Sequence, residues 1–517
     1  MAEPSFLLPD PARPEANAAA RRAMGAAAER IAAYLSSMAE RPIFPAAAHA
    51  PAGELIPERG ESLDSLFGDA ADWAEKNAIH VGNPGYAGHM DSGVSVAGLL
   101  GDWLTSALNQ NLLAYELAPG ATLLEKKLID EFALQAGYGP GAGGIFTTGG
   151  TVANLTALLL ARDSSSRDAS RLGLSGEHPL CVLASEDAHY SIGKACAVLG
   201  LGSERVLPVP VTGPERRLDP AALAGVRTQA LQRGLRPIAL VATAGTTSCG
   251  AVDPIAACAD FCDEHGLWLH VDGAHGGALI FHPGERARLL GGLNRADSFS
   301  FDPHKWLWAP KSAGVLLVRR NEDLVTSRYH APYLDRFSDH GDALPVSQGR
   351  RALDGSRRFD ALKVWMILRH LGRRGLAAAI ESRLSLTGWL HQHLSEHAYF
   401  APRHRPDLNV LAFAPRAAAD EVSIAAVHRA LEREGRFWSS YTVLDGRPCH
   451  RVVLLNPTTE ASHLTGLVDR LHRLHEEANC GSQPPEGLLH SSPPLPQKRH
   501  LFPGSDPADS SPDPRSR

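Results

Sequence analysis

The sequence predicts an α/β protein with a large domain around a mainly parallel β-sheet and a small C-terminal α+β domain. Short apolar runs alternate with helical patterns between about residues 140 and 320, which is typical of parallel strands covered by helices. Near residue 375 this alternation gives way to a long helix followed by fewer strands. A chain of 517 residues is also long enough for two domains.

The predicted elements follow in order along the chain. After a proline-rich start, an alanine-rich amphipathic pattern predicts a helix from about Asn17 to Glu40. Helical stretches continue to about residue 135. The predicted strands of the large domain are Cys181–Ala184, Val206–Val209, Ile238–Thr243, Leu267–Val271, Ser298–Phe301 and Gly314–Val318. The helical patterns between them include His189–Leu199, Pro220–Arg233 and Pro254–His265.

These patterns divide the chain into four parts. We expect an N-terminal helical arm over residues 1–90, a large domain over residues 91–375 and a small domain over residues 376–478. In the small domain, the apolar runs Asn409–Phe413 and Arg451–Leu455 predict strands. The tail over residues 479–517 is rich in proline, serine and charge, a composition typical of disorder.

Composition narrows the possible functions. Hydrophobic residues make up 44% of the chain, and the formal net charge of −6 gives no reason to expect a nucleic-acid or membrane partner. No apolar run approaches the ~20 residues of a membrane-spanning helix. Of the seven cysteines, Cys258 and Cys262 lie four residues apart, but no second pair or histidine cluster completes a zinc site. An odd cysteine count without a basic-then-apolar leader suggests a reducing compartment, so we expect a cytoplasmic protein without a metal.

Lys305 directly follows the predicted strand Ser298–Phe301, in the sequence Asp302-Pro303-His304-Lys305. Ligands of α/β proteins bind in the crevice at the carboxyl ends of the parallel strands. A lysine amine at this crevice can hold an aldehyde cofactor as an imine, which gives a covalent but exchangeable attachment. The alternative is a solvated surface lysine.

Two further features of the predicted sheet fit such a cofactor. Asp272 ends the strand Leu267–Val271, where a carboxylate can keep a pyridine nitrogen protonated; the alternative is a capping aspartate. Gly149, Gly150 and Thr151 open a helix, and the N–H groups of a glycine-rich helix start can bind a phosphate. The order of phosphate turn, aspartate and lysine therefore indicates a phosphorylated pyridine aldehyde.

A histidine and a tyrosine are candidates for proton transfer. His189 precedes a helix and could stack on the cofactor ring, although a structural histidine is the alternative. Tyr333 lies in the polar stretch Tyr329–Gly349, and a loop of this length is unusual unless it is functional. A mobile lid that carries a proton donor would fit this segment.

Several motifs resemble the group II pyridoxal-dependent decarboxylases, which include glutamate, cysteine sulfinate, aromatic amino acid and diaminobutyrate decarboxylases. The motifs, in chain order, are Phe146–Leu155, Ala242–Thr247, Leu269–Ala274, Asp302–Trp306 and Arg357–Lys363. The likeness extends from about residue 80 to residue 475. It implies the aspartate-aminotransferase-like fold type I of pyridoxal 5'-phosphate (PLP) enzymes, a homodimer, and decarboxylation of an L-amino acid to the amine and CO2.

The resemblance also implies roles for individual residues. Lys305 matches the Schiff-base lysine, Asp272 the partner of the pyridine nitrogen, and Tyr333 the tyrosine that protonates the substrate carbon. His189 and Ala274 match the residues on opposite faces of the ring. Other matching positions lie around the cofactor: Gly149, Gly150, Thr151, Asp302 and His304 near the phosphate, Ser356 reaching it from the other subunit, and Thr247 near the ring oxygen.

The sequence departs from the family pattern at three positions. Gly273 replaces the usual alanine after the aspartate, and His275 replaces the usual aromatic residue. Asn83 stands where many relatives have a histidine before proline, which puts any role of that histidine in doubt.

The substrate stays open between two classes. Arg451 matches an arginine that contacts a substrate carboxylate in the glutamate enzymes, although a structural salt bridge is the alternative. His89 and Asp91 occupy the stretch that reads the substrate side chain, and Asp91 suits a cationic substrate. Cysteine sulfinate, glutamate, aspartate and 2,4-diaminobutyrate are all candidates. The alternatives to decarboxylation are a PLP-dependent aldehyde synthase or transaminase, and a non-catalytic binding protein with this fold.

Overall fold

The computed structural model describes residues 14–166, 168–174, 179–324, 347–417 and 421–479, and it divides into two compact units. The central unit is the continuous segment Val96–Ile380. Among the described residues, the terminal unit combines the chain up to Ser95 with the chain from Glu381 to Asn479. Among the described helices, none combines the length and the apolar character that crossing a bilayer requires.

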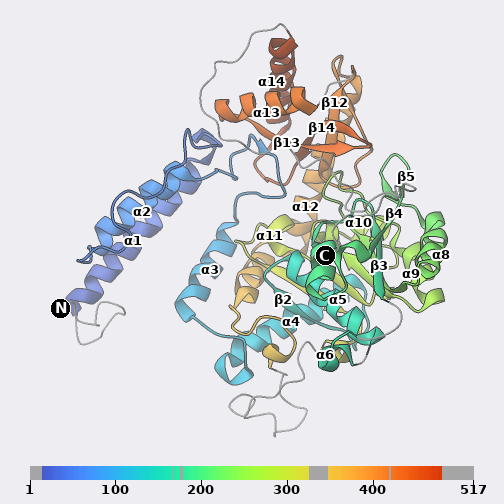
Figure 1. The fold of residues 1–517 in the computed structure, drawn as a ribbon. Coiled ribbons are helices and arrows are strands. Elements are labelled where there is room, and N and C mark those ends of the chain that lie inside the picture. Colours follow the sequence, from blue (N-terminus) through green and yellow to red (C-terminus); the bar gives the residue numbers. More distant parts are fainter. Residues whose placement is uncertain (1–13, 167, 175–178, 325–346, 418–420, 480–517) are drawn as a thin grey trace, which may run out of the picture. The chain divides into compact units, whose positions relative to one another are not determined.

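The central unit is built on a seven-stranded sheet that confirms the predicted, mainly parallel arrangement (Figure 1). Strand β10 is antiparallel to both of its neighbours, β2 and β9, and the other neighbouring strands are parallel. In spatial order the strands are β2 (Gly143–Thr147), β10 (Gly314–Val318), β9 (Ser298–Phe301), β8 (Trp268–Asp272), β7 (Arg236–Thr243), β3 (Leu180–Ser185) and β4 (Val206–Val209). Nearly every strand residue is buried, because helices cover the sheet.

Helices of the central unit pack on this sheet and position its carboxyl edge. Helix α5 (Gly150–Ser165) starts directly after β2 and buries its apolar residues against β7, β8, β9 and β10. The remaining helices are α3 (Val96–Leu108), α4 (Pro119–Ala136), α6 (Ala169–Leu172), α7 (Ser191–Val198), α8 (Leu223–Gln232), α9 (Ile255–His265), α10 (Pro283–Leu289) and α11 (Pro303–Trp306). A two-stranded hairpin, β5 (Val211–Thr212) and β6 (Arg217–Leu218), completes the unit.

A buried ion pair fixes the segment that follows the undescribed residues 325–346. The Nη2 atom of Arg357 donates to both carboxylate oxygens of Glu125 on α4, at 2.7 and 2.6 Å. Their side chains are 6% and 1% exposed, so almost no water screens the pair. The backbone of Arg357 also bonds to Leu112 and to the side chain of Asn111, which holds this segment against the start of the unit.

The terminal unit contains a five-stranded sheet in the order β1 (Tyr86–Ala87), β13 (Trp438–Leu444), β14 (Arg447–Val453), β12 (Val410–Pro415) and β11 (Phe400–Pro402). Strand β1 pairs parallel with β13, so residues assigned to a helical arm contribute an edge strand. Strand β13 was not expected, because its serines and threonine weaken the apolar pattern. The helices of this unit are α1 (Pro14–Ser36), α2 (Leu63–Asn77), α13 (Glu421–Glu434) and α14 (Ala461–Asn479).

Helix α12 (Asp360–Glu396) runs from the central unit into the terminal unit. It is interrupted at Gly372, whose φ of +62° and ψ of 175° are not helical. Glycine is suited to this position because it has no Cβ to resist a positive φ.

Three buried histidines join the helices of the terminal unit to its sheet. His450 on β14 contacts His428 on α13 through Nδ1, at 3.0 Å, and His475 on α14 through Nε2, at 2.9 Å. Burial lowers the pKa of His428 to about 3 and that of His475 to about 4, and it also lowers the pKa of His450. All three rings, called the histidine chain below, are therefore neutral at physiological pH.

Asn83, one of the departures from the family pattern, has a structural role in this unit. Its Nδ2 donates to the carbonyl oxygens of Arg41 and Met38, at 2.8 and 3.3 Å, and its Oδ1 accepts from the N–H of Gly85. Asn456 donates to the backbone carbonyl of Asn83 at 2.9 Å. The Asn83 side chain therefore ties the segment after α1 to the strand region of the terminal unit.

Candidate active site

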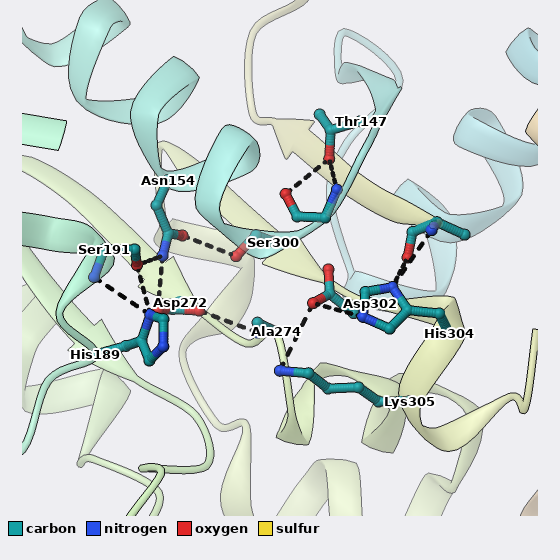
Figure 2. Close-up of polar contacts among 12 residues, drawn as sticks. Thr147, Asn154, His189, Ser191, Asp272, Ala274, Ser300, Asp302, His304 and Lys305 are labelled. Atoms are coloured by element: carbon teal, nitrogen blue, oxygen red, sulfur yellow. Dashed lines mark hydrogen bonds and ion pairs between the residues drawn. The ribbon is translucent and has the colours of Figure 1, made fainter. Parts of the chain in front are cut away.

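The predicted cofactor residues converge at the carboxyl edge of the central sheet (Figure 2). Asp272 is the last residue of β8, and Asp302 follows the neighbouring parallel strand β9. Lys305 lies in the short helix α11 that comes directly after Asp302. Neighbouring parallel strands end on the same side of a sheet. Asp272 and Lys305 therefore reach one site although they lie 33 positions apart in the sequence.

Asp302 is the charged centre next to the lysine. Its Oδ2 lies 3.6 Å from the Nζ of Lys305 and 3.6 Å from the Nε2 of His304. Its Oδ1 is buried and has no hydrogen-bond partner among the described residues. The Nδ1 of His304 donates to the carbonyl oxygen of Ala313 at 2.5 Å, which fixes the orientation of the ring. Burial lowers the pKa of His304, against the opposing effect of the Asp302 carboxylate.

The glycine pair brings the start of α5 close to these residues. Gly149 has a φ of +144°, a conformation that side chains of L-residues rarely adopt. A Cβ on Gly150 would lie 2.8 Å from the Cβ of Ala274 and 3.3 Å from Asp302 Oδ2. No side chain fits between the helix start and these neighbours, so the N–H groups at the start of α5 remain accessible to an anion. Thr151 lies in the same first turn.

Asp272 is held as a buried carboxylate by two donors. Its Oδ2 accepts from the Nδ2 of Asn154 at 2.8 Å, and its Oδ1 accepts from the N–H of Ala274 at 3.1 Å. The residue is only 4% exposed. Each carboxylate oxygen has two lone pairs, so both can accept a further hydrogen bond from a ligand.

His189 lies beside this carboxylate and is oriented by Ser191. Its Nδ1 lies 2.8 Å from the Ser191 hydroxyl and accepts from the Ser191 N–H at 3.3 Å. Burial lowers the pKa of His189; the charge of Asp272 opposes this shift and that of Lys305 adds to it. His189 is therefore neutral at physiological pH and close enough to both groups to respond to their charges.

The other predicted cofactor residues lie in different settings. Thr247 is exposed in the turn after β7. Ser356 is also exposed, and its hydroxyl accepts from Asn111 at 3.4 Å. Tyr333 lies outside the described residues.

The two departures beside Asp272 are explained by packing. A Cβ on Gly273 would lie 2.5 Å from the Phe299 ring and 2.6 Å from the carbonyl oxygen of Ser300, so the alanine of other family members has no room here. His275 is buried, with its ring 5.6 Å from the ring of Trp306, and takes the place of an aromatic residue in the core.

The predicted substrate residues belong to the terminal unit and lie close together. Arg451 is buried, and its Nη1 donates to Ser440 Oγ at 2.8 Å and to the carbonyl oxygen of Gly88 at 3.5 Å. His89 is the next residue, and its ring contacts Trp438 edge-on at 4.9 Å. Burial raises the pKa of Tyr86, with Asp91 adding to the shift and Arg451 opposing it, so these charges share one neighbourhood.

Asn154 and Ser191 were not predicted as site residues, although they contact the predicted catalytic groups directly. Asn154 lies one turn after Gly150, in a helix whose other buried residues are apolar except for Thr156. A buried polar residue in an apolar stretch needs hydrogen-bond partners, and this is the signal that could have identified it.

The donor set of the central unit fits PLP. Lys305 supplies the amine and Asp272 a buried carboxylate, while the glycine turn and helix start suit a phosphate. The buried, unpartnered Oδ1 of Asp302 also marks a place where a polar group is expected. Among the described residues, no group of His, Cys, Asp and Glu side chains could hold a metal ion.

Known proteins with similar sequences are amino acid decarboxylases. The pyridoxal-dependent decarboxylase conserved domain matches residues 45–414. L-2,4-diaminobutyrate decarboxylase of Rhizobium meliloti is 34% identical over 425 residues, which are 80% of this chain and 83% of that protein. Acidic amino acid decarboxylase GADL1 of Homo sapiens is 34% identical over 341 residues, 65% of this chain and 64% of that protein. Cysteine sulfinic acid decarboxylase of Mus musculus is 35% identical over 330 residues, 62% of this chain and 65% of that protein. The match thus spans just under two thirds of each mammalian relative.

Solved structures with the same fold confirm the predicted fold type I of PLP enzymes. The glutamate decarboxylase domain of the diaminobutyrate-pyruvate transaminase and L-2,4-diaminobutyrate decarboxylase from Vibrio parahaemolyticus has a TM-score of 0.76 and 28% identity, over 88% of this chain and 96% of that chain. Oryza sativa TDC, solved with PLP and tryptamine, has a TM-score of 0.81 and 25% identity, over 89% of this chain and 98% of that chain. The chain therefore belongs to the pyridoxal-dependent decarboxylase family, whose cofactor is pyridoxal 5'-phosphate.

Proposed function

We propose that this enzyme converts an L-amino acid to the corresponding amine and CO2, with Lys305 holding PLP and Asp272 polarising it. The observation that carries the proposal is the convergence of the Lys305 amine and the buried Asp272 carboxylate at adjacent strand ends. Bound PLP supplies a protonated pyridine ring that accepts the electrons released when a bond at the substrate carbon breaks.

Different residues of the central unit would bind different parts of PLP. Asp272 would keep the proton on the pyridine nitrogen, because a buried anion favours a neighbouring cation. The N–H groups after Gly149 would bind the phosphate, with Thr151 beside them. The charge of Asp302 is offset by the Lys305 amine at 3.6 Å, so it does not repel the phosphate without compensation. Thr247, and Ser356 from a second subunit, are proposed further contacts.

Proton return to the substrate carbon is proposed for Tyr333, directly or through His189. His189 suits this role because burial keeps it neutral, so its ring can both give and accept a proton. Ala274 would support the ring on the other face.

The test is a comparison of wild type with Lys305→Ala. Wild type should show a visible cofactor band, and reduction with borohydride should leave a PLP mass adduct on the peptide that contains Lys305. Lys305→Ala should lack the adduct and release no CO2. A wild type without the band and the adduct would be a non-catalytic protein with this fold. Aldehyde, ammonia and peroxide in place of the amine, with CO2 still released and O2 consumed, would identify an aldehyde synthase. A keto acid without CO2 would identify a transaminase.

For the substrate, we propose a diamino acid of the 2,4-diaminobutyrate class. The match to the diaminobutyrate decarboxylase covers 83% of that protein, more than the 64–65% of the acidic amino acid enzymes. Arg451 donates to Ser440 and Gly88 within its own unit, which favours a structural role for its guanidinium. Asp91 is then the charged group that would select an ammonium side chain.

An acidic substrate is the second candidate, because Arg451 is buried and suits a carboxylate or sulfinate. A panel of 2,4-diaminobutyrate, glutamate, aspartate and cysteine sulfinate separates the two. Asp91→Asn should lower kcat/KM for the diamino acid by on the order of tenfold or more, the effect of one lost charge-assisted contact. Activity on the acidic substrates alone, abolished by Arg451→Met, would favour the second candidate.

We also propose that the enzyme is a homodimer. Helix α3 carries a row of apolar residues spaced four apart, which therefore share one face: Val96, Leu100, Leu104 and Leu108, all 48–62% exposed. Contiguous exposed apolar surface of this kind is typical of an interface. Sedimentation should give about twice 55.2 kDa for wild type, and Leu104→Glu should shift the mass toward the monomer. An unchanged mass in Leu104→Glu would exclude this face.

A further inference from the structure

We propose that Asn154 is a positioning residue that fixes two groups of the reaction at once, the carboxylate of Asp272 and the ring of His189. This inference rests on the roles proposed above for those two residues. The side-chain amide of Asn154 would then set both the orientation of the Asp272 carboxylate and which ring nitrogen of His189 carries the hydrogen.

The amide of Asn154 uses its full hydrogen-bonding capacity. The residue lies on α5 and is 1% exposed. Its Nδ2 donates to Asp272 Oδ2 at 2.8 Å and to Ser191 Oγ at 2.9 Å (Figure 2). Its Oδ1 lies 2.9 Å from His270 Nε2 and accepts from the Ser300 hydroxyl at 3.3 Å. Two N–H groups and two lone pairs are thus all engaged.

The orientation of the amide follows from these partners. A flipped amide would turn its oxygen toward the carboxylate of Asp272, where two acceptors would repel each other. The Ala274 N–H donates to the other Asp272 oxygen. Asp272 therefore receives one donor on each oxygen, which stabilises the charged form needed beside a pyridine nitrogen.

The direction of the hydrogen bonds behind Asn154 is fixed from its far end. The indole of Trp268 can only donate, and it donates to Ser298 Oγ at 2.9 Å. The Ser298 hydroxyl is then available to donate to His270 Nδ1, which lies 2.9 Å away. His270 is completely buried, and burial lowers its pKa to about 4, so the ring is neutral and carries its hydrogen on Nε2. That hydrogen points to the oxygen of Asn154, in agreement with the orientation of the amide.

The hydrogen bonds of Ser191 set the tautomer of His189. Because Ser191 Oγ accepts a hydrogen from Asn154, its own hydrogen can go to His189 Nδ1 at 2.8 Å. The Ser191 N–H donates to the same Nδ1 at 3.3 Å. With two donors directed at Nδ1, the hydrogen of the neutral ring lies on Nε2. His189 therefore presents an N–H at Nε2, the only ring nitrogen left for transferring a proton.

A purely structural asparagine would stabilise the helix–sheet contact and do nothing else. Asn154→Leu removes all four bonds with little change in size. Ser191→Ala removes only the branch to His189 and leaves the bond to Asp272. Asn154→Asp retains the acceptor toward His270 and gives Ser191 a carboxylate to donate to, while it replaces the donor toward Asp272 by a second acceptor. Thr156→Val is the matched control, because Thr156 is equally buried on α5 but its hydroxyl bonds, within the described part of the chain, only to the Val152 carbonyl.

The experiment measures two properties that do not depend on turnover. One is the Kd of the apoprotein for PLP. The other is the pair of ring ¹⁵N signals of His189, identified by their loss in His189→Gln. Asn154→Leu should weaken PLP binding by about 10- to 100-fold, the range for a lost hydrogen bond to a charged group, while Thr156→Val should bind PLP as wild type does. Wild type and Thr156→Val should carry the His189 hydrogen on Nε2, and Ser191→Ala and Asn154→Asp should carry part of it on Nδ1.

The proposal is overturned if Asn154→Leu binds PLP as tightly as Thr156→Val, or if the Nε2–H signal of His189 is unchanged in Ser191→Ala and Asn154→Asp. If Asn154→Leu does not fold, the ¹⁵N signals of the other two variants decide the matter. Failure of the proposed function would look different, because wild type itself would then not bind PLP.

Discussion

Gly150→Ala tests whether the close approach at the start of α5 is required for cofactor binding. The new Cβ would lie 2.8 Å from the Cβ of Ala274, whereas non-bonded carbon atoms prefer about 3.5–4.0 Å. It would also lie 3.3 Å from Asp302 Oδ2. The helix start and Ala274 must therefore separate by roughly 1 Å, and overpacking of this kind costs about 1–3 kcal/mol. Because Ala274 and Asp302 border the proposed cofactor site, PLP affinity should fall with stability.

The assay is a urea titration of the apoprotein at fixed concentration, together with a PLP titration. We expect the free energy of unfolding to fall by about 1–3 kcal/mol and the Kd for PLP to rise at least about tenfold, equivalent to ~1.4 kcal/mol. Gly193→Ala is the matched control: Gly193 lies in α7 with no atom within 4 Å of its added Cβ, so the change should stabilise by up to ~1 kcal/mol. If Gly150→Ala changed the free energy of unfolding and the Kd for PLP no more than Gly193→Ala does, the start of α5 would not pack as tightly against Ala274 and Asp302 as described.

Three further results are expected. Arg357→Met should lower the free energy of unfolding by about 3–5 kcal/mol because it leaves the buried Glu125 carboxylate unpaired, and adding Glu125→Leu should recover most of this loss in urea titrations. The free energy of unfolding of the terminal unit should fall as the pH falls from about 6.5 toward 4, because the histidines bind protons in the unfolded polypeptide but not in the folded histidine chain. Urea unfolding midpoints measured between about pH 7.5 and 5 would check this. Midpoints that do not change over this range would mean that the three histidines are already protonated in the folded state. Gly88→Ala should destabilise by about 3 kcal/mol or more, because its Cβ would lie 1.7 Å from the Trp438 ring; a thermal unfolding midpoint equal to that of wild type would contradict the packing described.

Much of the central sheet could be predicted because its strands are buried on both faces. The runs Ser298–Phe301 and Gly314–Val318 coincide with β9 and β10. Their relative direction could not be predicted, since nothing in the apolar pattern says that β10 lies antiparallel between β2 and β9. The two-residue strand β1 is defined by its partner alone and has no local pattern.

The residues of the site also differ in whether they could be predicted from the sequence. Asp272 and Lys305 follow apolar strands, and their position at strand ends can be read directly from the chain. The contacts of Asn154 could not be found in this manner, because its four partners come from three different parts of the chain: Ser191 on α7, His270 and Asp272 on β8, and Ser300 on β9. Such contacts exist only after the sheet has formed.

The pairing of β1 with β13 has a consequence for biosynthesis. Tyr86 lies opposite Trp438, so the edge strand leaves the ribosome about 350 residues before its partner. At about 5–20 residues per second, that interval lasts roughly 20–70 s. The segment Val96–Ile380 is complete about 60 residues before Trp438, roughly 3–12 s earlier, and can form its own core while Tyr86 still lacks the strand with which it pairs. During translation the emerging N-terminal segment is therefore the part that most needs protection by chaperones.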